Sequence, residues 1–158
     1  FGHSDGGSIA LLYATRHACA GVMVMAPHLM VEEVSVQSIA QAKLAYENTD
    51  LRQRLARYHL DVDSAFWGWN RVWLSPEFRS WSIEHELASI TCPVLAIQGI
   101  NDEYGTLAQI RDIQSHVPHT QLLELADCGH SPHRDQAQAL TQACLQFFQS
   151  HSSTTAQP

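Results

Sequence analysis

Basic residues are scarce in this sequence of 158 residues. Nine Lys and Arg residues, of which Lys43 is the one lysine, stand against 16 Asp and Glu, giving a formal net charge of −7. Binding to nucleic acid requires basic side chains that neutralise phosphates, so nucleic acid is not an expected partner. No apolar run approaches the roughly 20 residues that cross a bilayer, so membrane insertion is not expected either. With 45% hydrophobic and 16% charged residues, the chain is predicted to form one globular domain with its own core.

The sequence also lacks closely paired cysteines. No C-x-x-C motif occurs among the four cysteines, which are Cys19, Cys92, Cys128 and Cys144. This spacing excludes a zinc ribbon and a thioredoxin-type redox motif. We therefore expect reduced thiols and a cytoplasmic location, while the even count leaves disulfides in a periplasmic protein open.

Histidine, by contrast, is abundant, and two H-x-x-H pairs raise the question of a metal. His116 and His119 are separated by a Val-Pro step that breaks a helix and spoils a shared face. His130 and His133 have no cysteine or carboxylate at a recognisable ligand spacing. We predict no metal site and no cofactor, and keep a metal-binding regulator as a third reading of the chain.

Short apolar runs alternate with helical segments along the sequence. The runs lie at 21–25, 93–97 and 121–125, and helical patterns lie at 7–17, 106–116 and from about Asp135 onward. Continuous apolar runs are typical of strands buried on both faces, so the pattern predicts an α/β fold with a mostly parallel sheet flanked by helices. We assign residues 1–26 and 90–150 to this core, 27–89 to a helical insertion, and 151–158 to a disordered tail.

The clearest chemical motif stands at the start of the chain. Residues 2–6 read Gly-His-Ser-Asp-Gly and match G-x-S-x-G, followed by another glycine and a helix-forming run. A serine on a sharp strand-to-helix turn needs small neighbours, because Cβ atoms at Gly2 and Gly6 are expected to collide there. The turn exposes the Ser4 hydroxyl, and the Asp5 backbone N–H at the helix start is placed to stabilise an oxyanion.

An acid and a histidine follow the other two predicted strands. Asp102 comes just after the second run and His130 just after the third. Functional groups in α/β sheets gather beyond the carboxyl ends of strands, so serine, acid and histidine appear where a catalytic triad needs them. Glu103 is the competing acid. We prefer Asp102 and expect Glu103 to stay exposed or to cap the helix that begins near Thr106.

At these residues the sequence resembles the α/β-hydrolase fold family, specifically its cap-bearing serine esterase and carbon–carbon-bond hydrolase branch. The matching segments are 2–7, 94–102 and 128–133. The resemblance implies Ser4 as nucleophile, Asp102 as orienting acid and His130 as general base. It also implies that the insertion is a cap over the active site.

We therefore expect a hydrolase that cleaves a small, largely apolar ester or related carbonyl substrate through an acyl-enzyme on Ser4. His3, Trp67, Trp69 and Trp73 are candidate substrate-binding residues, although the tryptophans also suit the core of the insertion. The alternative is a non-catalytic receptor for a small ligand on the same fold. The sequence leaves ester, lactone, amide and carbon–carbon cleavage open.

The resemblance also implies that the family's first half, with its second oxyanion donor, precedes the segment that begins at Phe1. We expect the chain to be the C-terminal portion of a longer hydrolase and to be inactive or nearly so alone, since one lost oxyanion donor can cost about 10²–10³ in rate. We also expect self-association through an exposed sheet edge.

Overall fold

The chain forms two compact units. The computed structural model describes residues 1–152. The core unit comprises Phe1–Met30 and the described residues from Ser82 onward, and the insertion unit comprises Val31–Trp81.

A parallel sheet forms the centre of the core unit. Among residues 1–152 its strands are β1 (Gly2–His3), β2 (Val22–Met25), β3 (Val94–Gly99) and β4 (Thr120–Leu125), paired in that order and all parallel. Every residue of β2 and β3 is buried, which explains their continuous apolar sequences. The predicted α/β fold with a mostly parallel sheet is confirmed.

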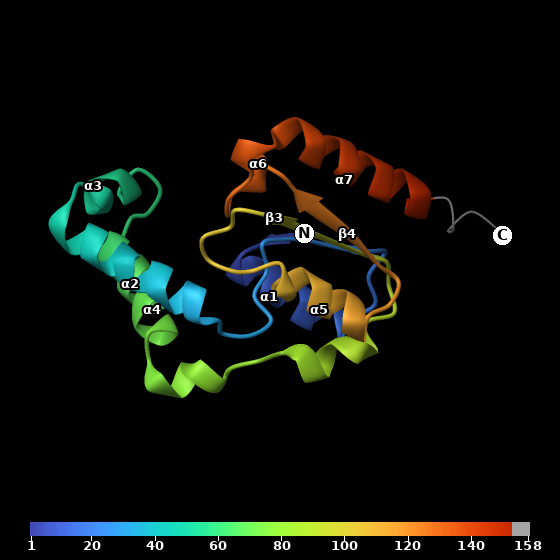
Figure 1. Cartoon of the computed structure of the whole chain (residues 1–158), viewed down its shortest axis with the longest axis horizontal. Coiled ribbons are helices and arrows are strands. Elements are labelled where there is room, and N and C mark those ends of the chain that lie inside the picture. The colour runs from blue at the N-terminus through green and yellow to red at the C-terminus, as the bar shows by residue number, and fades with distance from the viewer. Residues whose placement is uncertain (153–158) are drawn as a thin grey trace. The chain divides into compact units, whose positions relative to one another are not determined.

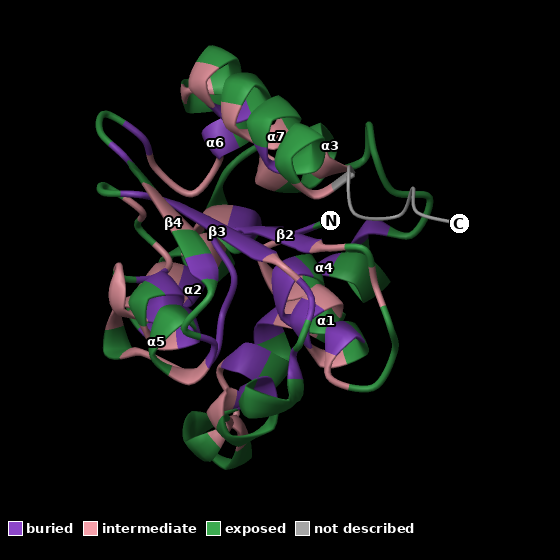
Figure 2. Cartoon of the chain, turned by 90° about the vertical axis from the view of Figure 1, so that its right-hand side faces the viewer, coloured by how far each residue is buried: buried purple, intermediate pink, exposed green. Residues whose placement is uncertain are grey.

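Helices cover both faces of this sheet. Helices α1 (Asp5–Ala14) and α5 (Ala108–His116) lie on one face, and α6 (Pro132–Asp135) and α7 (Ala137–Ser152) lie on the other (Figure 1). The burial colours show the strands sandwiched between these layers (Figure 2). Leu140 and Phe147 of α7 pack into a cluster with residues of the central strands, namely Met23, Met25, Leu95 and Ile97.

The end of α7 differs from the sequence prediction. The helix continues through Ser152, so His151 and Ser152 are helical although both were assigned to a disordered tail. The His151 ring contacts Phe147 one turn earlier, with centroids 4.9 Å apart, which favours continuation of the helix. The remainder of the predicted tail, 153–158, lies outside the described residues.

The insertion boundaries also differ from the predicted range of 27–89. Residues 27–30 and 82–89 belong to the core unit. The Ile83 N–H donates to the Leu29 carbonyl at 2.8 Å, and the short helix η2 (Glu84–Ser89) packs against α1 and α5. Leu29 and Leu87 are fully buried there, so these flanking segments are held by the core.

The insertion unit is built from helices: α2 (Glu33–Asn48), α3 (Leu51–Leu55), α4 (Val62–Trp73) and η1 (Pro76–Ser80). Its centre contains Tyr46, Val62 and Phe66, with the Tyr46 and Phe66 rings stacked at 3.8 Å. Asp61 caps α4 by accepting a hydrogen bond from the Ser64 N–H at 3.0 Å. None of the helices among residues 1–152 combines the length and apolar character needed to cross a bilayer.

Candidate active site

Ser4 occupies a sharp turn between β1 and α1. Its backbone angles are φ 56° and ψ −129°, a conformation that costs an L-residue about 1–3 kcal/mol. The turn is held because the Ser4 N–H donates to the Met25 carbonyl at 2.9 Å and the Gly7 N–H donates to the Ser4 carbonyl at 2.8 Å. Ser4 therefore lies at the carboxyl end of β1, as the motif predicts.

The glycines around Ser4 have different roles. A Cβ at Gly2 would lie 2.1 Å from the Gly6 carbonyl oxygen, so Gly2 has to lack a side chain. At Gly6 a Cβ would meet nothing within 4 Å, so the predicted steric reason for this glycine is wrong. The crowded position is Gly7, where a Cβ would lie 3.0 Å from Cβ of Pro27.

Ser4, His130 and Asp102 form a continuous hydrogen-bonded chain. Nε2 of His130 lies 2.9 Å from the Ser4 hydroxyl, and Nδ1 of His130 lies 2.9 and 3.1 Å from the two carboxylate oxygens of Asp102. A carboxylate accepts only, so Nδ1 carries a proton and Nε2 of the neutral ring is free to accept from Ser4. The structure thus brings the three predicted catalytic residues together.

The Asp102 side chain is 1% exposed, against 14% for that of His130. One carboxylate oxygen accepts from the Tyr104 N–H at 2.8 Å, and the other accepts from the Gln98 side-chain amide at 3.2 Å. These donors offset the cost of burying a carboxylate and fix its orientation toward His130. Gln98 is not among the residues that the sequence motifs predict, although a polar residue inside the buried run of β3 is a usable signal.

The loops after β3 and β4 cross at very close range. A Cβ at Gly99 would lie 2.1 Å from the Cys128 carbonyl oxygen, and the Asn101 N–H donates to that oxygen at 2.9 Å. Gly99 therefore has no room for a side chain. This crossing allows the segment that carries His130 to reach Asp102.

Glu103 does not take the position of the acid beside the His130 ring. The residue is exposed, as predicted, and its carboxylate accepts a hydrogen bond from the His130 backbone N–H at 3.2 Å. The first turn of α5 is instead capped by the Thr106 hydroxyl, which accepts from the Ala108 N–H at 3.2 Å. Glu103 therefore binds the backbone of His130, whereas Asp102 binds its ring.

Two further histidine rings lie beside His130, and a third lies beside His3. Their ring centroids lie 5.0 Å (His3 to His130), 5.2 Å (His133 to His3) and 5.9 Å (His28 to His130) apart. His3, predicted to bind substrate, places its Nε2 2.7 Å from the His130 backbone carbonyl. Burial lowers the pKa of His3 below its ordinary value. His28 is buried and its backbone is bound to Ser8, a contact that no local motif indicates.

The other predicted site residues fall in two places. Asp5 is the first residue of α1, where backbone N–H groups point out of the helix end. Trp67, Trp69 and Trp73 lie on α4 in the insertion unit. Trp67 and Trp69 are half-buried against Phe66, whereas Trp73 is 3% exposed and packs on Phe78. Their role in binding substrate stays a prediction.

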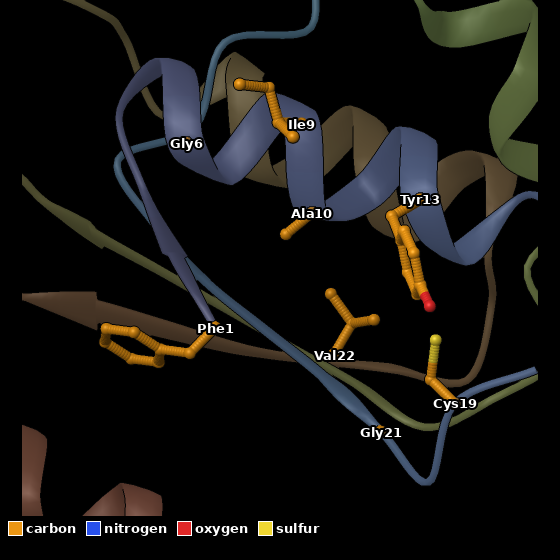
Figure 3. Close-up of a pocket in the computed structure, with 8 residues that line it drawn as sticks. All are labelled: Phe1, Gly6, Ile9, Ala10, Tyr13, Cys19, Gly21 and Val22. Carbon is orange, nitrogen blue, oxygen red and sulfur yellow. The ribbon is translucent and has the colours of Figure 1, made fainter. Parts of the chain in front are cut away.

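A hollow of about 350 Å³ lies beside α1 (Figure 3). The side chains of Ala10 and Tyr13 from α1 point toward Val22 at the start of β2, and Phe1 and Ile9 also line the hollow. Its walls include none of the residues predicted to bind substrate. Phe1, Ile9 and Tyr13 are 70, 67 and 56% exposed, so this is an apolar face of the core unit.

Both histidines of the first pair considered for metal binding contact backbone carbonyls. His116 Nδ1 lies 2.9 Å from the Asp112 carbonyl, and His119 Nε2 lies 2.9 Å from the Cys92 carbonyl. Within residues 1–152, no three His, Cys, Asp or Glu side chains gather into a group that could hold a metal ion. The four cysteines have free thiols.

Comparisons with known structures agree with this fold. A membrane phospholipase A described as a bacterial virulence factor matches with a TM-score of 0.74 and 20% identity, over 97% of this chain and 57% of that one. A carboxylesterase of the thaumarchaeon Nitrososphaera gargenis matches with a TM-score of 0.72 and 15% identity, over 96% of this chain and 64% of that one. The enol-lactonase of Burkholderia xenovorans LB400 matches with a TM-score of 0.64 and 21% identity, over 94% of this chain and 64% of that one.

The chain spans 57–65% of the length of the first structures it matches. No curated protein matches its sequence. The sequence profile of the alpha/beta hydrolase family covers residues 1–143, nearly the whole described chain. The fold, the order of the site residues along the chain and this match agree with the resemblance noted in the sequence: the chain belongs to the alpha/beta hydrolase family.

Proposed function

We propose that the chain carries the catalytic centre of a serine hydrolase. Ser4 is the nucleophile, His130 the general base, and Asp102 the acid that orients His130. The observation that carries this proposal is the unbroken hydrogen-bonded chain from Asp102 through His130 to Ser4, 2.9 Å at each link. The neighbouring thiol is a poor competitor, because burial raises the pKa of Cys128 to about 11.

The reaction would proceed through an acyl-enzyme. The Ser4 oxygen attacks the substrate carbonyl carbon while its proton moves to Nε2 of His130, and the Asp5 backbone N–H stabilises the oxyanion. The intermediate collapses, and the leaving alkoxide takes the proton from His130. Water then attacks the acyl group by the same proton path, releasing the acid and restoring Ser4.

The proposed substrate is a small, largely apolar ester or related carbonyl compound. The half-buried Trp67 and Trp69 offer aromatic surface in the insertion unit, and the similar structures include a carboxylesterase and an enol-lactonase. We propose that the Asp5 backbone N–H is the oxyanion donor supplied by the motif, and loss of one oxyanion donor costs about 10²–10³ in rate.

Single-turnover acylation tests this proposal without requiring fast turnover. The chain is mixed with p-nitrophenyl esters of increasing acyl length, and p-nitrophenol release is measured together with the intact mass of the acyl-enzyme. We expect release and an acyl adduct that both disappear in Ser4→Ala. Saturable binding of the esters with no adduct on the folded chain would support the receptor alternative and contradict the hydrolase.

A further inference from the structure

We infer that His3 is a positioning residue for the general base, an inference that rests on the proposed function of Ser4 and His130. Its ring donates a hydrogen bond to the His130 backbone carbonyl and so fixes the base relative to the nucleophile. This role differs from the substrate contact expected from the sequence.

The geometry defines the direction of this hydrogen bond. Nε2 of His3 lies 2.7 Å from the His130 carbonyl oxygen, which can only accept, so His3 carries a proton on Nε2. The ring is itself anchored, since His3 belongs to β1 in register with Met25 of β2. The centroid of its ring lies 5.0 Å from that of His130 and 5.2 Å from that of His133.

The contact completes a set of restraints on His130. Asp102 holds Nδ1 of the ring, Glu103 accepts from the backbone N–H at 3.2 Å, and His3 donates to the backbone carbonyl. Because His3 directly precedes Ser4 in the chain, its hydrogen bond links the base to the segment that carries the nucleophile. The segment that positions the Ser4 oxygen thus also positions the ring that accepts its proton.

The charge state of His3 agrees with this role. The groups that face it are His130, His133 and Asp102, and burial is the largest influence, lowering the pKa of His3. A neutral His3 still donates from Nε2. It places no second positive charge beside His130 when that ring takes up the serine proton.

Two variants separate the hydrogen bond from the bulk of the ring. In His3→Gln the side-chain amide can place an N–H near the position of Nε2, whereas His3→Leu fills similar space without a donor. We expect acylation by His3→Leu to slow about 10- to 100-fold with little change in KM, and His3→Gln to recover most of the rate.

Histidine-ring NMR provides a readout that does not depend on activity. We expect the His130 Nδ1 proton to be visible and slow to exchange in the wild type and His3→Gln, and broadened by exchange in His3→Leu. Thermal unfolding confirms that each variant is folded. Unchanged His130 signals in folded His3→Leu would overturn the inference, as would a His3→Gln variant that behaves like His3→Leu.

The same measurements distinguish this inference from the proposed function. A wild-type chain that never forms an acyl adduct contradicts the hydrolase proposal. Dependence of the His130 ring signals on the His3 donor in that chain would still establish the positioning contact.

Discussion

The Ser4 hydroxyl and the His130 ring lie 126 positions apart in the sequence and 2.9 Å apart in the structure. They follow β1 and β4, which are separated in the sheet by β2 and β3, a span of about 14 Å at the usual strand spacing. The segment after β4 therefore has to cross the end of β3 to reach Ser4. It crosses at Gly99, where the Cys128 carbonyl occupies the space of a side chain.

Replacing Gly99 with alanine should separate His130 from Ser4. The added Cβ would lie 2.1 Å from the Cys128 carbonyl oxygen, so one of the two loops has to move. Because a displacement of about 1 Å can cost about 100-fold in rate, we expect acylation of Ser4 to fall at least that far. Gly6→Ala is the matched control: its Cβ meets nothing within 4 Å, and its acylation rate should stay near that of the wild type. Equal rates in the two variants would contradict this account of the crossing.

The two neighbouring carboxylates should respond differently to neutralisation. Asp102→Asn removes the negative charge that stabilises the protonated His130 ring, and its amide N–H can face Nδ1 and favour the wrong tautomer, so we expect a loss of about 10⁴ in kcat. Glu103→Gln keeps an oxygen that can accept from the His130 N–H, so its loss should be below about tenfold. Pre-steady-state ester hydrolysis measures both. A larger loss in Glu103→Gln would assign the orienting acid to Glu103.

The insertion unit should lose stability in acid through Asp63. Hydrogen bonds from Arg52 and then Tyr46 lower the pKa of Asp63 from 3.8 to about 2. A lowered folded-state pKa means that the ionised form favours folding, so this stabilisation is complete above about pH 4 and is lost as the pH falls toward 2. The side chains of Arg52 and Asp63 are about half exposed, so the effect should be small.

Near-ultraviolet circular dichroism measures this effect, because all four tryptophans lie between Trp67 and Trp81. The wild-type signal should decline over the range from pH 4 to 2. Asp63→Asn should be less stable at pH 7, and its circular dichroism signal should change less between pH 4 and 2. Identical acid titrations of the two proteins would rule out a contribution from Asp63.

The apolar hollow beside α1 should promote self-association. Ile9 is 67% exposed at this face, next to β1, an outer strand of the described sheet. We expect the purified chain to form concentration-dependent oligomers in light scattering, and Ile9→Lys to shift them toward monomer. Leu60→Lys adds the same charge at an exposed residue of the insertion unit and should leave the oligomers unchanged. A chain that stays monomeric at high concentration would contradict the prediction.

Much of the fold was predictable because its signals are local. The strands around Val24 and Ala96 appear in the sequence as short continuous apolar runs, and their burial on both faces explains why. The proximity of Ser4, Asp102 and His130 was predictable from their order along the chain and from their places after β1, β3 and β4. The strand that holds each residue is adjacent to it in sequence.

What the sequence did not predict depends on contacts between distant segments. The open space at Gly6 and the crowding at Gly99 are set by neighbours that no local motif identifies. The contact of His3 was not predictable because its partner is a backbone carbonyl, a group that every residue type carries and that no sequence motif identifies. The insertion boundary was placed too widely because Leu29 and Leu87 have no strand pattern, and only their burial shows that they belong to the core.

The most direct test of the central claim is to label the folded chain with a fluorophosphonate and locate the adduct by peptide mass spectrometry. Only an activated serine hydroxyl reacts with this reagent at a useful rate. We predict one adduct, on Ser4, that is absent in Ser4→Ala and much slower to form in His130→Gln. A folded chain that acquires no adduct on Ser4, or that labels Ser4 equally fast without His130, would contradict the assignment of Ser4, His130 and Asp102 as a catalytic triad.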